Sequence, residues 1–311
     1  MSTTASATAG LSTTSEGIWL TAALLGVRQL PEALKVRPVG SIAETVADHP
    51  GLEVLEAQGV CRGRVVDSDV AEWIGVLGRP DIEVDVVVSR PQTEPTGELG
   101  PPPLFNAPED PYEAAAALAE WHRQRARRAA VICRRDDQWV SAVRLWRAGE
   151  DSIDDIVVTP LGTAPIGTSV TQVLGPGEPA QFHGINIETD VLRPILTDWQ
   201  QHPHHDVVRE LVHAGVSVPQ ARIIRSAADA SATQATLAAA QFTIDGPQWA
   251  SLALSISNTL SGRVLVSNSI APDGQQWTTL LPGTGQAIET AVVELLESLP
   301  AGGDWTGHQR V

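Results

Sequence analysis

The sequence predicts an α+β fold, a quasi-twofold repeat of two subdomains that share a central, mainly antiparallel β-sheet. Three observations lead to this prediction. A β-hairpin rich in Val, Ile and Trp lies in the middle of the chain and turns at Asp136-Asp137. Helices followed by strands precede the hairpin, and the second half of the chain repeats that order. The string EVLEAQGV at 53–60 is also matched by ELVHAGV at 210–216.

Composition bounds the class of protein. The 311 residues are 42% hydrophobic and 19% charged, as in soluble globular proteins. A net charge of -16 argues against nucleic acid or an anionic membrane as the main partner. Two cysteines, Cys61 and Cys133, are too few for a disulfide framework. With no secretory signal and no long apolar run, we predict a cytoplasmic protein without membrane insertion, with a disordered tail over residues 1–10.

The N-terminal subdomain is expected over residues 11–160. Hydrophobic periodicity and capping residues define its elements before the hairpin. In chain order they are a strand over 11–15, an apolar helix over 18–25 ended by Gly26, an extended segment over 34–38, a helix from about Ile42 to Gln58 interrupted at His49-Pro50-Gly51, a helix over 70–77 and an alternating strand over 82–88. A further strand is expected over 151–158.

A long loop over residues 90–127 interrupts these strands and is rich in Pro and Gly at its start. An insertion of this length is usually functional or disordered. The hairpin that follows is apolar on both faces. If Arg135 faces Gln138 across the turn, strand alternation places Ala130, Ile132, Trp139, Val143 and Leu145 on one face, and Val131, Cys133, Val140, Ala142 and Trp146 on the other. Such a hairpin is covered by protein on both sides, or it offers one side to a partner.

The C-terminal subdomain is expected over residues 161–311, after a Gly/Pro-rich connection over 162–184. A helix is predicted over 219–230, and an amphipathic helix over 284–299 closes the chain. Strands at 251–256, 263–266 and 276–281 are expected to correspond to 82–88, 131–134 and 138–146.

A group of histidines is the first candidate for a chemical site. His202-Pro-His-His205 is followed by His213, and imidazoles bind zinc or nickel. No Cys or acidic ligand motif accompanies them, so a solvated segment is favoured and no metal or other cofactor is predicted. A metal-binding protein or an enzyme that uses the His202–His213 group stays as an alternative.

Other patterns favour a binding protein over an enzyme. The chain has no G-x-S-x-G, C-x-x-C or H-E-x-x-H motif, and the string LPGTGQAI at 281–288 is interpreted as a plain helix start. Six arginines lie between 122 and 135 without interleaved aromatic residues. A solvated or partner-facing basic strip is therefore favoured over a nucleic-acid site.

A series of short strings runs in order through nearly the whole chain. The strings are EGIWLTAALLG at 16–26, LKVRP at 34–38, HPG at 49–51, EAQG at 56–59, PDIEV at 80–84, QWVSAVR at 138–144 and LPAGGDW at 299–305, with RV at 310–311. The series resembles the EspG family of ESX (type VII) secretion-associated proteins. Residues 91–127 and 161–190 match least.

The resemblance implies a cytosolic chaperone without catalytic activity, folded as a central sheet flanked by helical bundles. Such a chaperone binds a PE-PPE heterodimer by the tip of the PPE subunit, keeps it soluble and delivers it to the ESX secretion machinery. The family's contacts imply the 90–127 loop, an exposed hairpin face and helices between Asp206 and Ala240. A structural component that binds the secretion apparatus and no substrate is a further alternative.

Position and chemistry select the candidate partner-binding residues on these elements. We expect Trp139, Val143 and Leu145 to hold the core. The candidates are Val140, Arg144 and Trp146 on the hairpin, and Val208, Leu211, Val212, Ile223 and Ile224 on the helices.

Overall fold

The computed structural model describes residues 10–36, 46, 49–89, 127–146, 155–162, 165–229 and 232–310, apart from the side chains of Arg127 and Trp146. The predicted tail before Gly10, the start of the helix expected from Ile42 and nearly all of the 90–127 loop lie outside the described residues.

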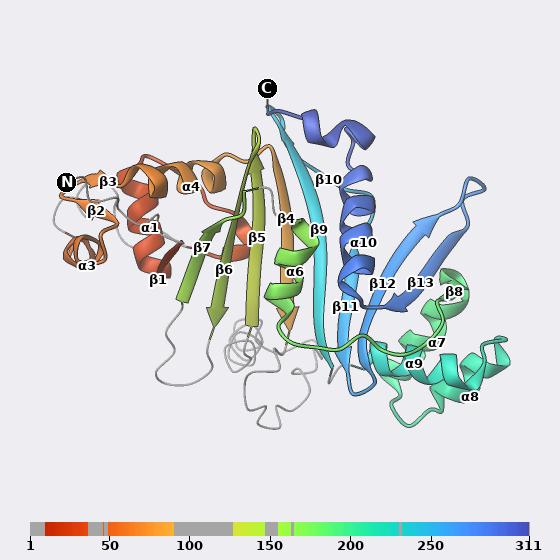
Figure 1. Cartoon of the computed structure of the whole chain (residues 1–311). Coiled ribbons are helices and arrows are strands. Elements are labelled where there is room, and N and C mark those ends of the chain that lie inside the picture. Colours follow the sequence, from red (N-terminus) through yellow and green to blue (C-terminus); the bar gives the residue numbers. More distant parts are fainter. Residues whose placement is uncertain are drawn as a thin grey trace, which may run out of the picture.

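The described elements follow one another as helices and strands in both halves of the chain (Figure 1). The helices are α1 (Ser15–Leu24), η1 (Glu32–Leu34), α3 (Gly51–Ala57), α4 (Ser68–Gly78), α6 (Ile166–Leu174), α7 (Thr189–Gln201), α8 (Val207–His213), α9 (Val218–Ala228), α10 (Gly285–Glu297) and η2 (Gly302–Gly307). The strands are β1 (Leu11–Thr14), β2 (Cys61–Arg62), β3 (Val65–Val66), β4 (Ile82–Ser89), β5 (Arg127–Arg135), β6 (Gln138–Trp146), β7 (Asp155–Pro160), β8 (Ile185–Glu188), β9 (Thr233–Thr243), β10 (Gly246–Trp249), β11 (Leu254–Thr259), β12 (Gly262–Ile270) and β13 (Gln276–Pro282).

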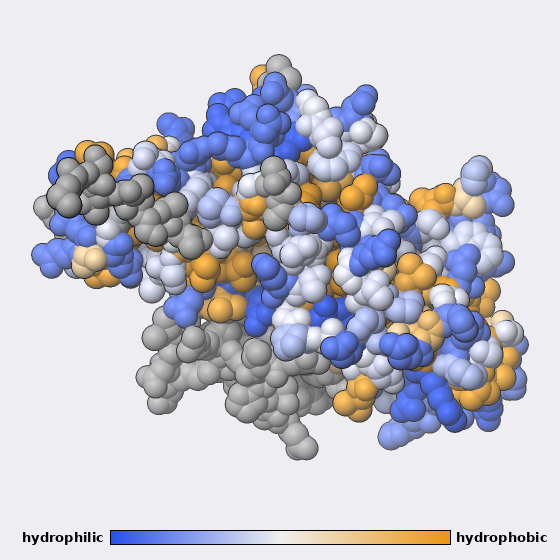
Figure 2. Space-filling view, viewed as in Figure 1, coloured by the Kyte–Doolittle hydropathy of each residue, from blue (hydrophilic) through white to orange (hydrophobic). Residues whose placement is uncertain are grey.

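One 11-stranded sheet organises the molecule. Its order is β1-β7-β6-β5-β4-β9-β11-β12-β13-β8, and β10 adds to β9. The pairs between these strands are antiparallel. The predicted α+β class with a central, mainly antiparallel sheet is thereby confirmed. Hydrophilic residues gather at the end of the sheet where the β5–β6 turn and the C-terminus lie (Figure 2).

Strand β9 joins the two halves of the sheet, because it pairs with β4 along eight residues. Two helices, α8 and α9, lie in the expected range between Asp206 and Ala240, and α9 ends at Ala228, close to the predicted end at Ala230. Alanine at 235 and 238–240 favours a helix by propensity. Burial decides otherwise: Ala235, Leu237 and Ala239 alternate into the core, as on one face of a strand.

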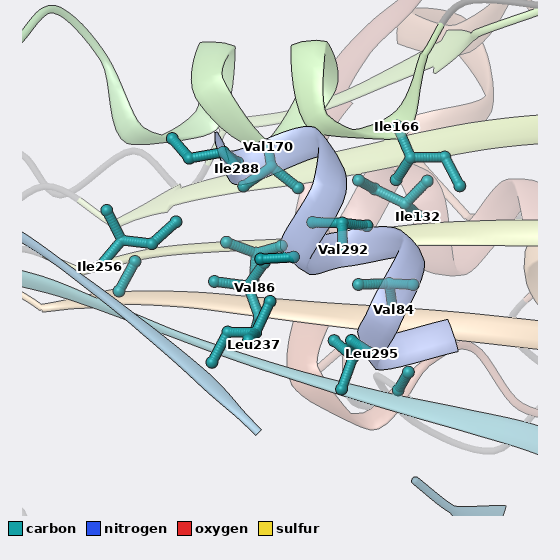
Figure 3. Packing of buried hydrophobic residues seen from close by; sticks show 14 of the residues in the cluster. Val84, Val86, Ile132, Ile166, Val170, Leu237, Ile256, Ile288, Val292 and Leu295 are labelled. Atoms are coloured by element: carbon teal, nitrogen blue, oxygen red, sulfur yellow. The ribbon is translucent and has the colours of Figure 1, made fainter. Parts of the chain in front are cut away.

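One face of the sheet is covered by α6 and α10, and the largest core cluster lies between (Figure 3). Val84 and Val86 of β4 meet Val292 of α10 and Val170 of α6 in this layer. Helix α6 corrects the predicted Gly/Pro-rich connection over 162–184, because residues 166–174 are helical and place Val170 in the core. Thr284 caps α10, its hydroxyl accepting from the backbone N–H of Ala287 at 3.1 Å, which confirms the plain helix start.

The opposite face is covered by helices at its two ends. At one end α1, α4 and η1 pack on β5, β6 and β7 around a second core cluster. At the other end α7, α8 and α9 pack on β8, β12 and β13 around a third. Alternation along the paired strands places both clusters on the same face of the sheet, opposite α6 and α10. The central strands of this face lie between the two groups of helices.

The two halves share an order and one local geometry. In each half, the strand at the outer edge of the sheet comes first in the chain. The other four strands then follow in chain order from the centre of the sheet toward that edge. The turns after α3 and α8 are alike: Gly59 and Gly215 have φ of 75° and 90°, and Val60 and Val216 donate back to Leu55 and Leu211. Glycine at both positions permits this left-handed helix end. These likenesses support the predicted quasi-twofold repeat and the two-subdomain division, which stay predictions.

The described helices are short. The longest, α7 and α10, have 13 residues each, whereas a membrane-spanning helix needs about 20. Within the described part of the chain, none has the length and apolar character to cross a membrane.

Candidate protein-binding surface

The β5–β6 hairpin has the predicted register, with Arg135 paired to Gln138, and it is covered on both faces. Val140 is 2% exposed and belongs to the cluster beneath α4. Arg144 is buried, and its guanidinium donates to the carbonyl oxygens of Leu34 and Lys35. The expectation that Val140 and Arg144 face a partner is therefore wrong, because η1 and α4 cover this end of the sheet. The side chain of Trp146 lies outside the described residues.

The other face of the hairpin follows the prediction more closely. Trp139 and Val143 are partly buried and pack against the core cluster beneath α6 and α10. Trp139 also meets Trp305 of η2 edge to face, with ring centroids 6.3 Å apart. Leu145 is partly buried.

In the part of the chain that the structure describes, a strip across the central strands lies between the two helix groups. Because Val84, Val86 and Val88 point toward α6 and α10, alternation turns Asp85 and Val87 to the opposite face. The register places Asp85 opposite Ala238 and Val87 opposite Thr236 on β9. Val87 is 42% exposed, and Thr236 is also exposed.

Trp249 extends the strip onto β10. It lies opposite Ala240, which follows Thr236 and Ala238 on this face of β9, and it is 55% exposed. An exposed indole over small neighbours is the kind of side chain that anchors a protein interface. We call Asp85, Val87, Thr236, Ala238 and Trp249 the central strip.

A pair of acidic groups lies in the floor of the strip. Glu83 and Asp85 share a side-chain hydrogen bond, and the Cys133 thiol donates to Glu83 Oε2 at 4.0 Å. Burial, followed by the charge of Asp85, raises the pKa of Glu83 to about 8. Burial also raises the pKa of Asp85 to about 6, with Glu32 adding to the shift. Glu83 is therefore the carboxyl of the pair that keeps its proton to the higher pH. Oδ1 of Asp85 is buried without a hydrogen-bond partner in the described structure.

The helices α8 and α9 expose only part of the predicted set. Leu211 is 0% exposed and Ile224 is 1% exposed, so their predicted place on the surface is wrong: their positions on the helices turn them into the third core cluster. Val208 and Ile223 are partly buried against that cluster, and Val212 is 37% exposed. Hydrophobic residues reach the molecular surface around α8 (Figure 2).

A groove of about 410 Å³ separates α7 from α9 above the sheet. Leu192 and Leu196 of α7 line one side and Ala228 of α9 the other. Ser255 also lines it and pairs with Thr236, so the groove borders the central strip.

The predicted basic strip is partly structural. Arg134 is 3% exposed and donates to the carbonyl oxygens of Thr306 and His308, which ties the C-terminal segment to β5. Arg128 donates to the carbonyl of Val173 at 2.6 Å. Arg123 and Arg125 lie outside the described residues.

The predicted histidine group is divided by the structure. His202 and His205 both contact Asp198, an acidic neighbour that the sequence reasoning overlooked four residues before His202. His213 lies on α8 outside this cluster.

Comparison with known proteins gives the same assignment as the sequence strings. The sequence model of the EspG family matches residues 14–102 and 103–294, which is most of the chain. The chain belongs to the EspG family.

Relatives from mycobacteria cover nearly the whole length of this EspG chain. It is 25% identical over 306 residues to the ESX-5 secretion-associated protein EspG5 of Mycobacterium marinum, covering 95% of each protein. It is 27% identical over 319 residues to the ESX-2 secretion-associated protein EspG2 of Mycobacterium tuberculosis, covering 97% of this chain and 99% of the relative. The fold matches the Mycobacterium tuberculosis type VII secretion system chaperone EspG5, solved in complex with a PE25-PPE41 dimer, with a TM-score of 0.71 and 23% identity over 96% of this chain and 100% of that chain.

The strip in this EspG chain was missed from sequence for an identifiable reason. Its β4 residues were visible, since Glu83, Asp85 and Val87 alternate with the buried valines. Its β9 residues, Thr236 and Ala238, lie in an Ala-rich segment for which no strand was predicted. Because β9 was not recognised as a strand, nothing in the sequence indicated that β4 lies at the centre of the sheet or that Trp249 lies on the same face as Val87.

Proposed function

We propose that this EspG protein is a cytoplasmic chaperone that binds PE-PPE heterodimers through the tip of the PPE subunit, keeps them soluble and targets them to an ESX secretion system. Family membership carries the proposal. The ESX-associated names of the relatives and the fold shared with a chaperone solved on a PE-PPE dimer support it. The same family assignment supports a role without catalysis.

The central strip is the proposed docking surface on the sheet. Val87 of β4 and Trp249 of β10 lie on opposite sides of β9 and four residues apart along it, because Val87 pairs with Thr236 and Trp249 with Ala240. Four residues of strand span roughly 13 Å, and a helix with its side chains is about 10–12 Å wide. The strip therefore has the length to receive the end of one helix of the partner's tip, with an apolar contact at each end.

The proposed surface continues onto the C-terminal bundle. Val212, with the partly exposed Val208 and Ile223, offers apolar contacts on α8 and α9. The negative charge of Asp85 in the strip favours a basic group on the docked tip. Predicted contacts of the 90–127 loop and of Trp146 belong to the same proposal.

Co-expression tests the function directly. The chain is produced together with each PE-PPE pair encoded in its own genome, and complexes are analysed by size-exclusion chromatography with light scattering. We expect a 1:1:1 complex and soluble PPE protein that is lost when the chain is omitted. Failure with every pair would contradict the proposal.

A second experiment separates the chaperone from the alternative structural component. A component of the secretion apparatus would co-purify with membrane-embedded machinery and leave PPE solubility unchanged. Affinity capture from the native cells, with separate cytosolic and membrane fractions, distinguishes the two. The chaperone is expected with PE-PPE proteins in the cytosolic fraction.

A further inference from the structure

Three side chains with metal-binding atoms meet where α7 ends and α8 begins. His202 Nδ1 lies 3.0 Å from Asp198 Oδ1, and His205 Nδ1 lies 2.6 Å from Asp198 Oδ2. One donor atom from each residue lies within 4.8 Å of the others. Among the described residues, this is the one group of His, Cys, Asp and Glu that meets that criterion.

The backbone brings the three residues together within a short segment. Asp198 and His202 are one helical turn apart, and the N–H of His202 donates to the carbonyl of Asp198 at 2.8 Å. The N–H of His205 donates to the carbonyl of His202 at 2.9 Å, which closes a turn around Pro203. The two imidazoles are then stacked, with ring centroids 5.0 Å apart and planes at 22°. Both Nδ1 atoms consequently point at one carboxylate without any long-range contact.

The donor set matches one class of metal ion. Two imidazole nitrogens and a carboxylate are ligands that Zn²⁺ takes readily. Mg²⁺ and Ca²⁺ prefer shells of oxygen ligands, so a pair of imidazoles disfavours them. The three side chains are about half exposed, at 50%, 57% and 55%, so water can complete a four-coordinate shell.

We propose that Asp198, His202 and His205 bind one Zn²⁺ ion at the α7–α8 corner. In the ion-free protein each imidazole donates its Nδ1–H to the carboxylate. On binding, the proton of each imidazole moves to Nε2, and the two freed Nδ1 lone pairs and a carboxylate oxygen coordinate the ion. The three side chains displace water from the hydrated ion, and no covalent bond other than these N–H bonds breaks.

The site has a mechanical consequence for the C-terminal bundle. The ion ties the last turn of α7 to the segment that enters α8, whose Val207 and Leu211 are core residues. An ion that binds the folded chain and not the unfolded one raises the thermal midpoint. Zn²⁺ is therefore expected to stabilise the bundle that carries Val212, independently of any protein partner.

Titration calorimetry with Zn²⁺ tests the proposal. The full-length chain, freed of any affinity tag and treated with chelator, is titrated at a pH above the ordinary imidazole pKa of about 6.5. We expect one ion per chain, and an increase in thermal midpoint on adding Zn²⁺ but not Mg²⁺. His202→Gln and His205→Gln are each expected to lower the affinity at least about tenfold, since even outer-shell changes cost that much.

His204→Gln is the matched control, because His204 lies in the same exposed segment and outside the cluster. It is expected to bind as the unaltered chain does. Circular dichroism without metal checks that each variant folds. No uptake of Zn²⁺, or an affinity unchanged in the His202→Gln/His205→Gln double variant, would overturn the proposal. Loss of binding in His204→Gln with retention in His205→Gln would overturn the assigned ligand set.

Discussion

Trp249 of β10 lies directly opposite Ala240 of β9 and is 55% exposed. Replacing Trp249 with Glu should weaken PE-PPE binding, because a buried interface tryptophan commonly contributes about 2 kcal/mol or more. That corresponds to a roughly thirtyfold higher Kd. Thermal stability should change little, since an exposed site usually contributes within about 0.5 kcal/mol. Calorimetry or interferometry with a purified PE-PPE pair measures the first effect, and thermal unfolding the second.

Leu260→Glu is the matched control for Trp249→Glu. Leu260 is fully exposed in the turn after β11, at the other end of that strand from Trp249. The charge change is the same, and the expected affinity is that of the unaltered chain. Equal losses in both variants would show that added negative charge, not loss of the indole, weakens binding.

Adjacent residues on α8 separate binding from stability. Leu211 is 0% exposed and Val212 is 37% exposed. Leu211→Ala should lower the free energy of unfolding by about 2–5 kcal/mol through lost burial and a cavity. Val212→Ser should leave unfolding nearly unchanged and weaken partner binding. Urea unfolding and affinity measured on both variants test this contrast; weakened stability in Val212→Ser would place that side chain in the core.

Arg144 should affect stability and not partner recognition. Its guanidinium holds the turn after η1 against the sheet through the carbonyls of Leu34 and Lys35. Arg144→Met should lower the free energy of unfolding by about 1.5–3 kcal/mol, the usual range for hydrogen bonds to a charged group. Urea unfolding measures this loss, with Arg79→Met, exposed at the end of α4, as the control. An unaltered stability with lost PE-PPE binding would instead return Arg144 to the interface.

The hairpin shows how far local patterns predict this fold. Period-two alternation and the Asp136-Asp137 turn were enough to predict the pairing of Arg135 with Gln138 and two apolar faces. Which element covers each face depends on contacts between distant segments, such as Arg144 with Leu34. Local alternation carries no information on such contacts, so Val140 was placed on the wrong side of the boundary between core and surface.

The helical and Ala-rich segments limit the site prediction in a different way. On α8, Val208, Leu211 and Val212 are all apolar, and only the packed bundle shows which of them is buried. On β9, the helix propensity of alanine opposes strand formation. The burial of β9 side chains beneath α10 decides in favour of the strand. The central strip depends on that outcome, because it forms only where β9 joins β4.

The acidic pair in the floor of the strip predicts a pH-dependent stability. Burial and the charge of Asp85 raise the pKa of Glu83 from its ordinary 4.5 to about 8, so the folded chain holds a proton that the unfolded chain releases. Stability from this group is fully present below about pH 4.5 and is lost as the pH rises through about 8.

Glu83→Gln keeps a hydrogen-bond donor toward Asp85 and does not titrate. The unfolding free energy of the variant minus that of the unaltered chain should therefore increase by on the order of a few kcal/mol as the pH rises from about 5 to 9, at about 1.4 kcal/mol per pKa unit. Urea unfolding across that range measures the difference, with Glu297→Gln on the exposed side of α10 as the control. A difference that stays constant with pH would show that Glu83 is ionised in the folded protein, and the strip would then carry two negative charges toward its partner.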